Sequence, residues 1–292
     1  MTGVSDVTWT ERPRLRRPVL VAAFSGWNDA GDAASAAVEF IAGRFEPSEM
    51  ARIDADEFTD YTNTRPTVRL EEGRTREVDW PDTVISGATV SGADGDLAIL
   101  EGAEPSLRWR RYSRAVIEVA REIDARMVIT LGSLLADVPH TRPVSVSGIA
   151  SDASLVDRLG FEHTSYEGPT GIVGVLQHEC TAAQLPSVSL WASVPHYVAA
   201  APNPKVALAL VRAFEGAAGV VVDGSDLETA AEDYERQVSA AVASDPEVRA
   251  FVERLESAMD EETEDAPPVN LPSGDTIASD FQRFLRQQKP NS

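Results

Sequence analysis

Several polar side chains of this sequence follow directly after apolar segments, which is where catalytic and binding groups of α/β proteins usually lie. Glu101 follows the run DLAIL, and His140 and Arg142 lie in the loop after MVITLGSLL. If these runs are parallel strands, a carboxylate, an imidazole and a guanidinium meet at one sheet edge, where they could perform acid–base chemistry or hold a small ligand. Tyr166 and Glu167, in the turn-rich segment YEGPTG, are expected at the same edge.

A structural role for the same residues predicts different contacts. Glu101 would then pair with an arginine such as Arg108 or Arg142, and histidines such as His140 and His196 would bind backbone groups of proline-bounded loops. We favour this interpretation, because such loops need polar side chains to satisfy their own backbone. The 4 histidines lack the H-E-x-x-H spacing, so the sequence predicts neither a metal site nor a cofactor.

The loop SGWNDAGD joins an apolar strand, Val19–Phe24, to a helical pattern. Backbone N–H groups at the start of a helix favour an anion, so this loop is similar to a phosphate cradle, with Asn28 as a polar candidate. However, Asp29 and Asp32 already place negative charge there, and neither the P-loop nor the G-x-G-x-x-G motif is present. We therefore expect a self-capped turn. Ser25 lacks the G-x-S-x-G context of a hydrolase nucleophile.

Apolar runs alternate with helical patterns over some 200 residues, which predicts a parallel or mixed sheet covered by helices on both faces. A helix is expected from about Ser106 to Asp124, and another from Pro204 through Phe214. Two alternating segments around EEGR predict a hairpin that extends the sheet. Residues 1–18 are expected to form a solvated arm.

The composition changes near residues 216–224. Between Asp223 and Ala266 there are fifteen Asp and Glu against three Arg, and apolar residues recur at helical spacing. We therefore divide the chain into an α/β domain, residues 1–222, and an acidic helical extension, residues 223–292, whose last predicted helix contains Ile277 and Phe284. The acidic face of this extension is expected to be solvated or to meet a basic partner.

Composition limits the function further. The 292 residues include 26 Lys and Arg against 47 Asp and Glu, a formal charge of −21, which argues against nucleic acid or an anionic membrane as a partner. Cys180 is the single cysteine, which is typical of a reducing compartment. The N-terminus lacks the apolar core of a signal peptide, and no apolar run is long enough to span a membrane. A soluble, cytoplasmic protein is expected.

Six blocks of the sequence together resemble the actinobacterial branch of the proteasome assembly chaperone 2 family. They are FSGWNDAGDAAS, the D-Y-x-x-x-R-P at residues 60–66, EGAEPSLRW, LGSLLADVPHTRP, SYEGPTGIVGVL and SLWASVPHYV, and they span about residues 19–215. The resemblance implies a three-layer α/β/α sandwich with a mixed sheet, similar to the nucleoside phosphorylase fold, with a C-terminal helical appendage. It also implies a homo-oligomer, with a trimer favoured, and no agreed catalytic residues. A shared surface is then expected at the matched polar positions Asn28, Asp29, Glu101, Arg108, His140, Arg142, Tyr166 and Glu167.

Two functions are consistent with these observations. The first is a non-enzymatic assembly chaperone or scaffold that binds a protein partner, with proteasome subunits implied by the resemblance. The second is a protein or enzyme that binds a nucleoside or phosphate ester in a cleft near Asn28, Glu101 and His140. The phosphorylase-like fold favours the second, and the missing basic phosphate clamp disfavours it.

Overall fold

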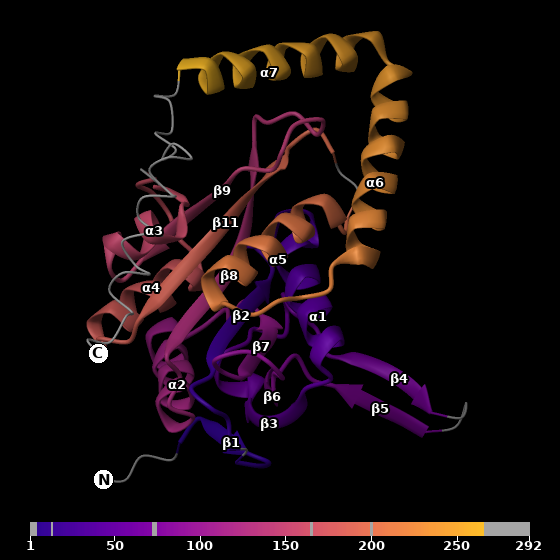
Figure 1. The fold of residues 1–292 in the computed structure, drawn as a ribbon. Coiled ribbons are helices and arrows are strands. Elements are labelled where there is room, and N and C mark those ends of the chain that lie inside the picture. Colours follow the sequence, from indigo (N-terminus) through magenta and orange to yellow (C-terminus); the bar gives the residue numbers. More distant parts are fainter. Residues whose placement is uncertain (1–4, 13, 72–74, 164–165, 199–200, 266–292) are drawn as a thin grey trace, which may run out of the picture.

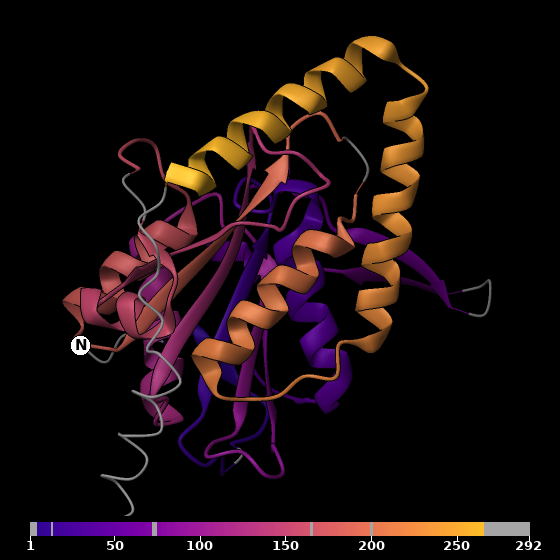
Figure 2. The ribbon, with the colours of Figure 1, turned by 45° about the horizontal axis from the view of Figure 1, so that its top comes forward.

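The computed structural model describes residues 5–12, 14–71, 75–163, 166–198 and 201–265. Within these residues, a nine-stranded mixed sheet lies between helices on both faces (Figures 1 and 2). Its strand order is β1-β3-β6-β7-β2-β8-β11-β9-β10. The strands are β1 (Val7–Trp9), β2 (Val19–Ser25), β3 (Ser48–Ile53), β6 (Thr83–Ala88), β7 (Leu97–Ala103), β8 (Met127–Ala136), β9 (Val146–Ala150), β10 (Glu162–His163) and β11 (Ser187–Pro195).

Strands β7, β2, β8 and β11 run parallel at the centre, whereas β6 and β9 run antiparallel to their neighbours β7 and β11. All residues of β2 except Ser25 are buried, as expected for a central strand covered on both faces. Alternate residues contribute to two separate cores, Val19, Val21 and Ala23 to one and Leu20, Ala22 and Phe24 to the other.

Helices cover both faces of this sheet, which confirms the expected α/β class. Helices α1 (Ala33–Phe45) and α5 (Pro204–Ala218) pack on one face, and α2 (Trp109–Glu122) and α4 (Ile172–Ala182) pack on the other. The short helix α3 (Ala153–Leu159) lies beside β9 and β10. Two single 3-10 turns, Ala30–Asp32 and Ala55–Glu57, follow β2 and β3.

Helix α2 begins at Trp109, later than the sequence predicts. The backbone N–H groups of Ser106 and Leu107 both donate to the carbonyl of Phe58, at 2.8 and 2.9 Å, so this segment is held outside the helix. Helix α5 begins as expected at Pro204, because the Asn203 side chain accepts a hydrogen bond from the Val206 N–H at 3.1 Å.

The predicted hairpin forms from β4 (Thr67–Glu71) and β5 (Thr75–Asp79), but the expectation that it extends the main sheet was wrong. The two strands pair only with each other, because β6 already lies between β3 and β7. The hairpin projects from the domain as an arm (Figure 1). The N-terminal segment also differs from the prediction, since β1 pairs with β3 at the sheet edge.

The C-terminal part forms two long helices, α6 (Ser225–Ala243) and α7 (Pro246–Asp265). Helix α6 packs against α5, and α7 turns back across the loops at the ends of β8 and β11 (Figures 1 and 2). The predicted final helix around Ile277 lies outside the described residues. Among the described helices, none has the length and apolar character needed to cross a membrane.

Candidate functional site

The candidate residues gather around one edge of the sheet, where the parallel strands β2, β7, β8 and β11 end. The segments that leave these strands lead into α1, α2, β9 and α5, and the segment before α4 reaches the same edge. In doubly wound sheets this edge is where ligands and partners are met. We refer to it as the strand-end edge.

Asn28 ties three of these segments together. Its side-chain amide donates to Glu104 Oε1 at 2.7 Å, and the same oxygen accepts from the backbone N–H of Ile172 at 2.8 Å. The backbone carbonyl of Asn28 accepts from the Ser133 N–H at 2.9 Å, which attaches the loop to β8. Asn28 is buried, and its Oδ1 has no hydrogen-bond partner among the described groups. The residue therefore fixes the positions of loops from β2, β7 and the segment before α4.

Asp29 caps α1 rather than meeting a ligand. Its carboxylate accepts from the backbone N–H groups of Ala34 and Ser35, at 2.7 and 3.2 Å, and from the Ser35 hydroxyl at 2.5 Å. Burial raises the pKa of this carboxyl above its usual value despite these hydrogen bonds. The donors at the start of α1 are thus already used, in agreement with the expected self-capped turn.

Glu101 lies inside β7 and not in the loop after it, where the sequence predicts it. Its side chain is partly buried. It lines a cavity of about 270 Å³ together with Ser25, Ser35 and Glu39. Burial and then the nearby charge of Glu39 raise the pKa of Glu101. The cavity lining includes neither His140 nor Arg142.

The expected pairing of Glu101 with Arg108 or Arg142 was wrong. Arg108 is exposed and binds Glu57, which also accepts from Arg111 at 2.9 Å. These residues lie where β3 and β7 lead into their next elements, so local ion pairs satisfy the arginines. Surface pairs of this kind add little stability but fix the orientation of the loops.

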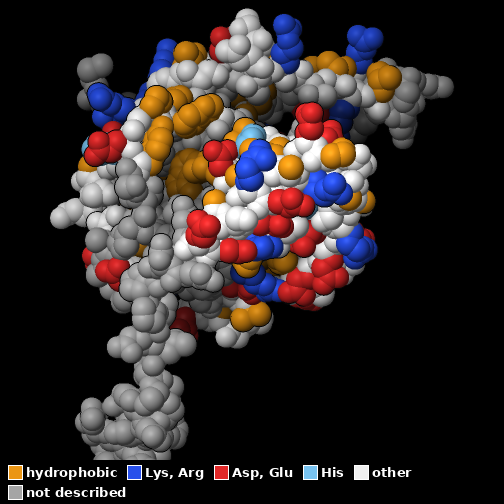
Figure 3. Space-filling view, turned by 90° about the horizontal axis from the view of Figure 1, so that it is seen from above, with side chains coloured by type: hydrophobic (Ala, Val, Ile, Leu, Met, Phe, Trp, Pro, Cys, Tyr) orange, Lys and Arg blue, Asp and Glu red, His pale blue; other side chains and the backbone are white. Residues whose placement is uncertain are grey.

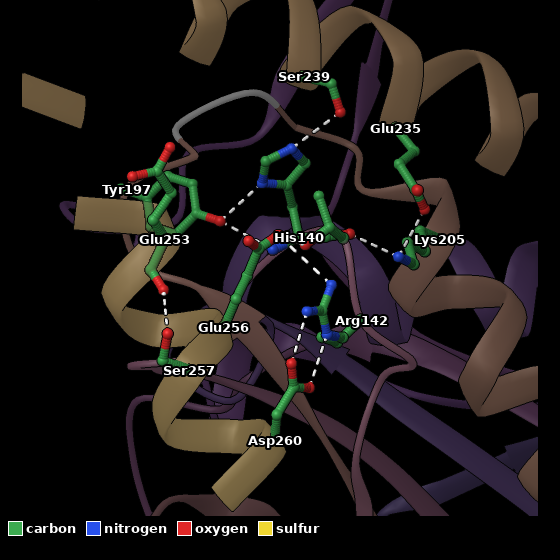
Figure 4. A network of polar contacts seen from close by, with 11 residues as sticks. His140, Arg142, Tyr197, Lys205, Glu235, Ser239, Glu253, Glu256, Ser257 and Asp260 are labelled. Carbon is green, nitrogen blue, oxygen red and sulfur yellow. Dashed lines mark hydrogen bonds and ion pairs between the residues drawn. The ribbon is translucent and has the colours of Figure 1, made fainter. Parts of the chain in front are cut away.

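His140 is held by side chains from separate elements (Figure 4). The Tyr197 hydroxyl accepts from the backbone N–H of His140 at 2.8 Å and lies 2.7 Å from its Nδ1. The Nε2 atom lies 3.1 Å from Ser239 Oγ, so both ring nitrogens are within hydrogen-bond distance of a hydroxyl group. Burial, followed by the charge of Lys205, lowers the pKa of His140. Its surroundings therefore favour the uncharged form of the ring.

Two further contacts join the His140 loop to the C-terminal helices. Lys205 donates to the backbone carbonyl of His140 at 2.5 Å and pairs with Glu235 of α6 at 2.6 Å. Arg142 binds both carboxylate oxygens of Asp260 of α7, at 2.9 and 2.7 Å (Figure 4). The cavity beside His140 and Arg142 has a volume of about 20 Å³, which is room for about one water molecule.

The sequence alone did not identify the partners of this cluster. Tyr197, Ser239, Glu256 and Asp260 come from segments far from residue 140 along the chain. The one available signal is that Glu256 and Asp260 are four residues apart, on one face of α7.

Tyr166 and Glu167 are both exposed and take no part in either cluster. The Tyr166 hydroxyl donates to the backbone carbonyl of Pro169 at 2.9 Å, within its own loop. The structure therefore brings together Asn28 with Asp29, and His140 with Arg142, but it does not gather the candidate residues into one cleft. Within the described residues, no group of three or more His, Cys, Asp and Glu is arranged to hold a metal ion.

Large apolar side chains are exposed at the strand-end edge, and of these the sequence analysis named only Tyr166. They are Trp27 after β2, Leu107 after β7, Leu134 and Leu135 at the end of β8, and Tyr166 before α4. We refer to these five residues as the strand-end apolar set. Figure 3 looks down on this edge and shows hydrophobic side chains around a hollow, with charged side chains on the surface beside it. Exposed apolar side chains gathered on one face are typical of a protein-binding surface.

Comparison with known proteins agrees with this fold. A family model described as the PAC2 family matches residues 23–242. The solved structure of a PAC2 family protein from Streptomyces avermitilis is 45% identical, with a TM-score of 0.76 over 80% of this chain and 99% of that one. A proteasome-assembly chaperone homologue from Mycobacterium tuberculosis is 44% identical, with a TM-score of 0.75 over the same 80% and 99%.

A more distant structure shares the fold alone. An archaeal proteasome activator from Pyrococcus furiosus is 16% identical, with a TM-score of 0.64 over 80% of this chain and 97% of that one. None of the curated proteins matches the chain. The family match covers well over half of the sequence, and two structures are more than 40% identical over most of it. The chain therefore belongs to the PAC2 family.

Proposed function

We propose that this protein is a non-enzymatic assembly chaperone or scaffold that acts on proteasome components through protein–protein contacts, as a homo-oligomer with a trimer favoured. The observation that carries the proposal is the strand-end edge itself. Its buried polar groups bind one another and the backbone, whereas the side chains that it presents to solvent include the strand-end apolar set. A surface built in this way binds a partner by apolar contact.

The comparisons support proteasome subunits as the partner to test first. The Mycobacterium tuberculosis relative is named a proteasome-assembly chaperone homologue, and it is 44% identical over 80% of this chain. The formal charge of −21 favours partners with basic surfaces and repels acidic ones. Since α7 crosses the loops that follow β8 and β11, the acidic extension lies at the strand-end edge and adds charge selection to apolar binding (Figure 2).

The proposal is tested by reconstituting assembly. Purified proteasome α- and β-subunits from the same organism are mixed with and without this protein, and assembled particles are followed by native gel and mass photometry. We expect the protein to bind free α-subunits and to increase the rate or yield of assembly. Absence of both a complex and an effect on assembly contradicts the proposal.

A matched pair of variants tests whether the strand-end apolar set contacts the proteasome subunits. Leu135→Asp puts a charge into the strand-end apolar set, where the side chain is 61% exposed. Val221→Asp makes the same change at a residue that is 85% exposed between α5 and α6. Leu135→Asp is expected to weaken binding of the subunits about tenfold or more, as at other apolar interface positions, while Val221→Asp leaves binding unchanged.

The alternative, a small-molecule site that uses Glu101 and His140 together, has less support. Glu101 lines a cavity under α1, whereas His140 lies in the cluster beneath α6 and α7. His140 also has both ring nitrogens engaged. A thermal-shift screen with nucleosides and sugar phosphates tests this alternative, because a ligand at a hundredfold its Kd adds about 2.7 kcal/mol of stability.

A further inference from the structure

The start of α2 is basic, although the chain as a whole is acidic. Residues 105–117 contain four Arg and no Asp or Glu, whereas the whole chain has a formal charge of −21. All four arginines are exposed, and they are Arg108, Arg110, Arg111 and Arg114. We refer to these four residues as the α2 arginine cluster. Helix α2 also covers the sheet face opposite to α5, on which the acidic helix α6 packs, so the cluster lies away from that helix (Figure 1).

The four arginines share one surface of the protein. Residues three or four positions apart lie on the same face of a helix, which places Arg114 beside both Arg110 and Arg111. Together with Trp109, the cluster lines an open hollow of about 460 Å³. The opposite face of α2 is buried, since Tyr112, Ala115, Val116 and Val119 pack in the core. The helix therefore holds the guanidinium groups together on its solvent side.

Half of the cluster is neutralised within the chain. Glu57 binds both Arg108 and Arg111, and a second carboxylate, from the N-terminal segment, binds Arg111 at 2.8 Å. Arg110 and Arg114 make no ion pair within the described part of the chain. Four guanidinium groups against two carboxylates leave an excess of two positive charges. This excess belongs to the two arginines without a partner.

We propose that the α2 arginine cluster binds an acidic segment of a protein partner, with Arg110 and Arg114 each binding one carboxylate. A guanidinium group is planar and binds a carboxylate through two parallel hydrogen bonds. Four residues of a helix rise by about 6 Å, and alternate residues of an extended segment lie about 7 Å apart. Acidic residues at every second position of an extended segment therefore match the spacing of the two unpaired arginines.

The charge around the cluster favours a polypeptide as the occupant. A nucleic acid duplex or a bilayer carries negative charge over a surface wider than the cluster, so it would also approach Glu118 and Glu122, which are exposed on the same helix. Repulsion between exposed charges acts over about 8 Å at physiological salt. An extended polypeptide contacts a narrow strip of α2 and avoids these carboxylates.

The cluster adjoins the strand-end apolar set, because Arg108 directly follows Leu107. The formal charge of −21 repels a partner that is acidic over its whole surface, so the cluster selects a partner in which the acidic residues are confined to one segment. Any protein that carries such a segment is a candidate. The binding of an acidic segment therefore goes beyond the proposed proteasome role and does not depend on it.

A matched pair of variants tests the cluster. The probe is a fluorescently labelled deca-glutamate peptide, and fluorescence anisotropy measures its binding to the full-length protein at about 50 mM salt. Arg114→Glu reverses one charge of the cluster, and Arg249→Glu makes the same change at an exposed position of α7. Both variants change the formal charge of the chain from −21 to −23, so they alter general repulsion equally.

We expect Arg114→Glu to weaken binding of the peptide about tenfold or more, whereas Arg249→Glu leaves it close to unchanged. Arg and Glu have similar helix propensities, so both variants should keep the melting temperature of the unchanged protein. Raising the salt to about 200 mM should weaken binding to the unchanged protein, because exposed charges are then screened.

Three outcomes overturn the proposal. The first is no binding of the peptide at the lower salt, and the second is an equal effect of the two variants. The third is a single-stranded DNA decamer, or a vesicle of anionic lipid, that binds more tightly than the peptide and is released by Arg114→Glu. The experiment contains no proteasome subunit, so a failure here is distinct from a failure of the assembly experiment.

Discussion

Substitution of Gly171 by alanine tests how tightly the strand-end edge is built. Gly171 precedes α4 with φ −97° and ψ −165°, an extended conformation that alanine adopts without strain. A Cβ at this position, however, would lie 2.5 Å from Glu104 Oε1 and closer still to the Asn28 amide. Any effect of the substitution therefore comes from the contact and not from the backbone.

The expected magnitude follows from two terms. Inserting a methyl group into a closed junction costs about 1–3 kcal/mol, because neighbouring groups must shift. Moving Glu104 also breaks its bonds to Asn28 and Ile172, and each buried group left without a partner costs about 1–2 kcal/mol. Since the two terms overlap, we expect Gly171→Ala to lower the free energy of unfolding by about 2–4 kcal/mol.

Urea denaturation followed by circular dichroism measures this change. With a dependence on urea of about 3 kcal/mol per molar, the midpoint should fall by about 1 M. Gly43→Ala is the control, because Gly43 lies inside α1 and a Cβ there meets no atom within 4 Å. It should stabilise the protein by about 0.5–1 kcal/mol, as alanine does in helix interiors.

An unchanged midpoint for Gly171→Ala would refute the close packing of this junction. A second variant then separates packing from hydrogen bonding. Asn28→Asp keeps the size of the side chain, removes the donor to Glu104 and places a second carboxylate beside it. A loss of stability here, without one for Gly171→Ala, would show that the bond matters and the close packing does not.

Three further predictions concern the charged groups. Glu101→Gln should stabilise the protein at pH 7 and less so at pH 4. Burial and the charge of Glu39 raise the pKa of Glu101, so its charged form is disfavoured in the folded state. Denaturation at both pH values measures the difference in stability. His140 should make the stability fall as the pH drops below 6.5, its ordinary pKa. Burial lowers the pKa of this side chain in the folded protein, so protonation favours the unfolded state. The melting temperature of His140→Gln should therefore change less between pH 7 and pH 5 than that of the unchanged protein. Arg142→Gln should let α7 detach more often, so hydrogen exchange in α7 should be faster, whereas exchange in the central strands should be unchanged.

The sheet could be predicted from the sequence because its central strands are buried on both faces. A strand such as β2 needs an unbroken apolar run, and this run is visible without knowledge of the neighbours. Features that depend on distant contacts were missed. Helix α2 begins late because Phe58 holds the segment before it, and the arm leaves the main sheet because β6 already has two neighbours.

The same reasoning applies to the candidate site. The positions of His140 and Arg142 at the strand-end edge follow from the order of the strands, which the alternating pattern indicates. Their partners come from α6 and α7, and the docking of these helices depends on side chains far along the chain. Apart from Tyr166, the strand-end apolar set was missed for a related reason, because an exposed Leu135 and a buried Leu131 in one strand look alike in the sequence.

Three polar residues at the strand-end edge share one property, which is that each joins two different segments. Asn28 joins the loops of β2 and β7, His140 joins the loop of β8 to α6, and Arg142 joins the same loop to α7. Each of these three side chains therefore holds separate segments in place. The sequence blocks that resemble the family contain these same residues. At this edge the resemblance therefore includes side chains that hold separate segments together. The shape of the exposed surface depends on those ties, and the proposed binding of a protein partner rests on the apolar side chains that this surface presents.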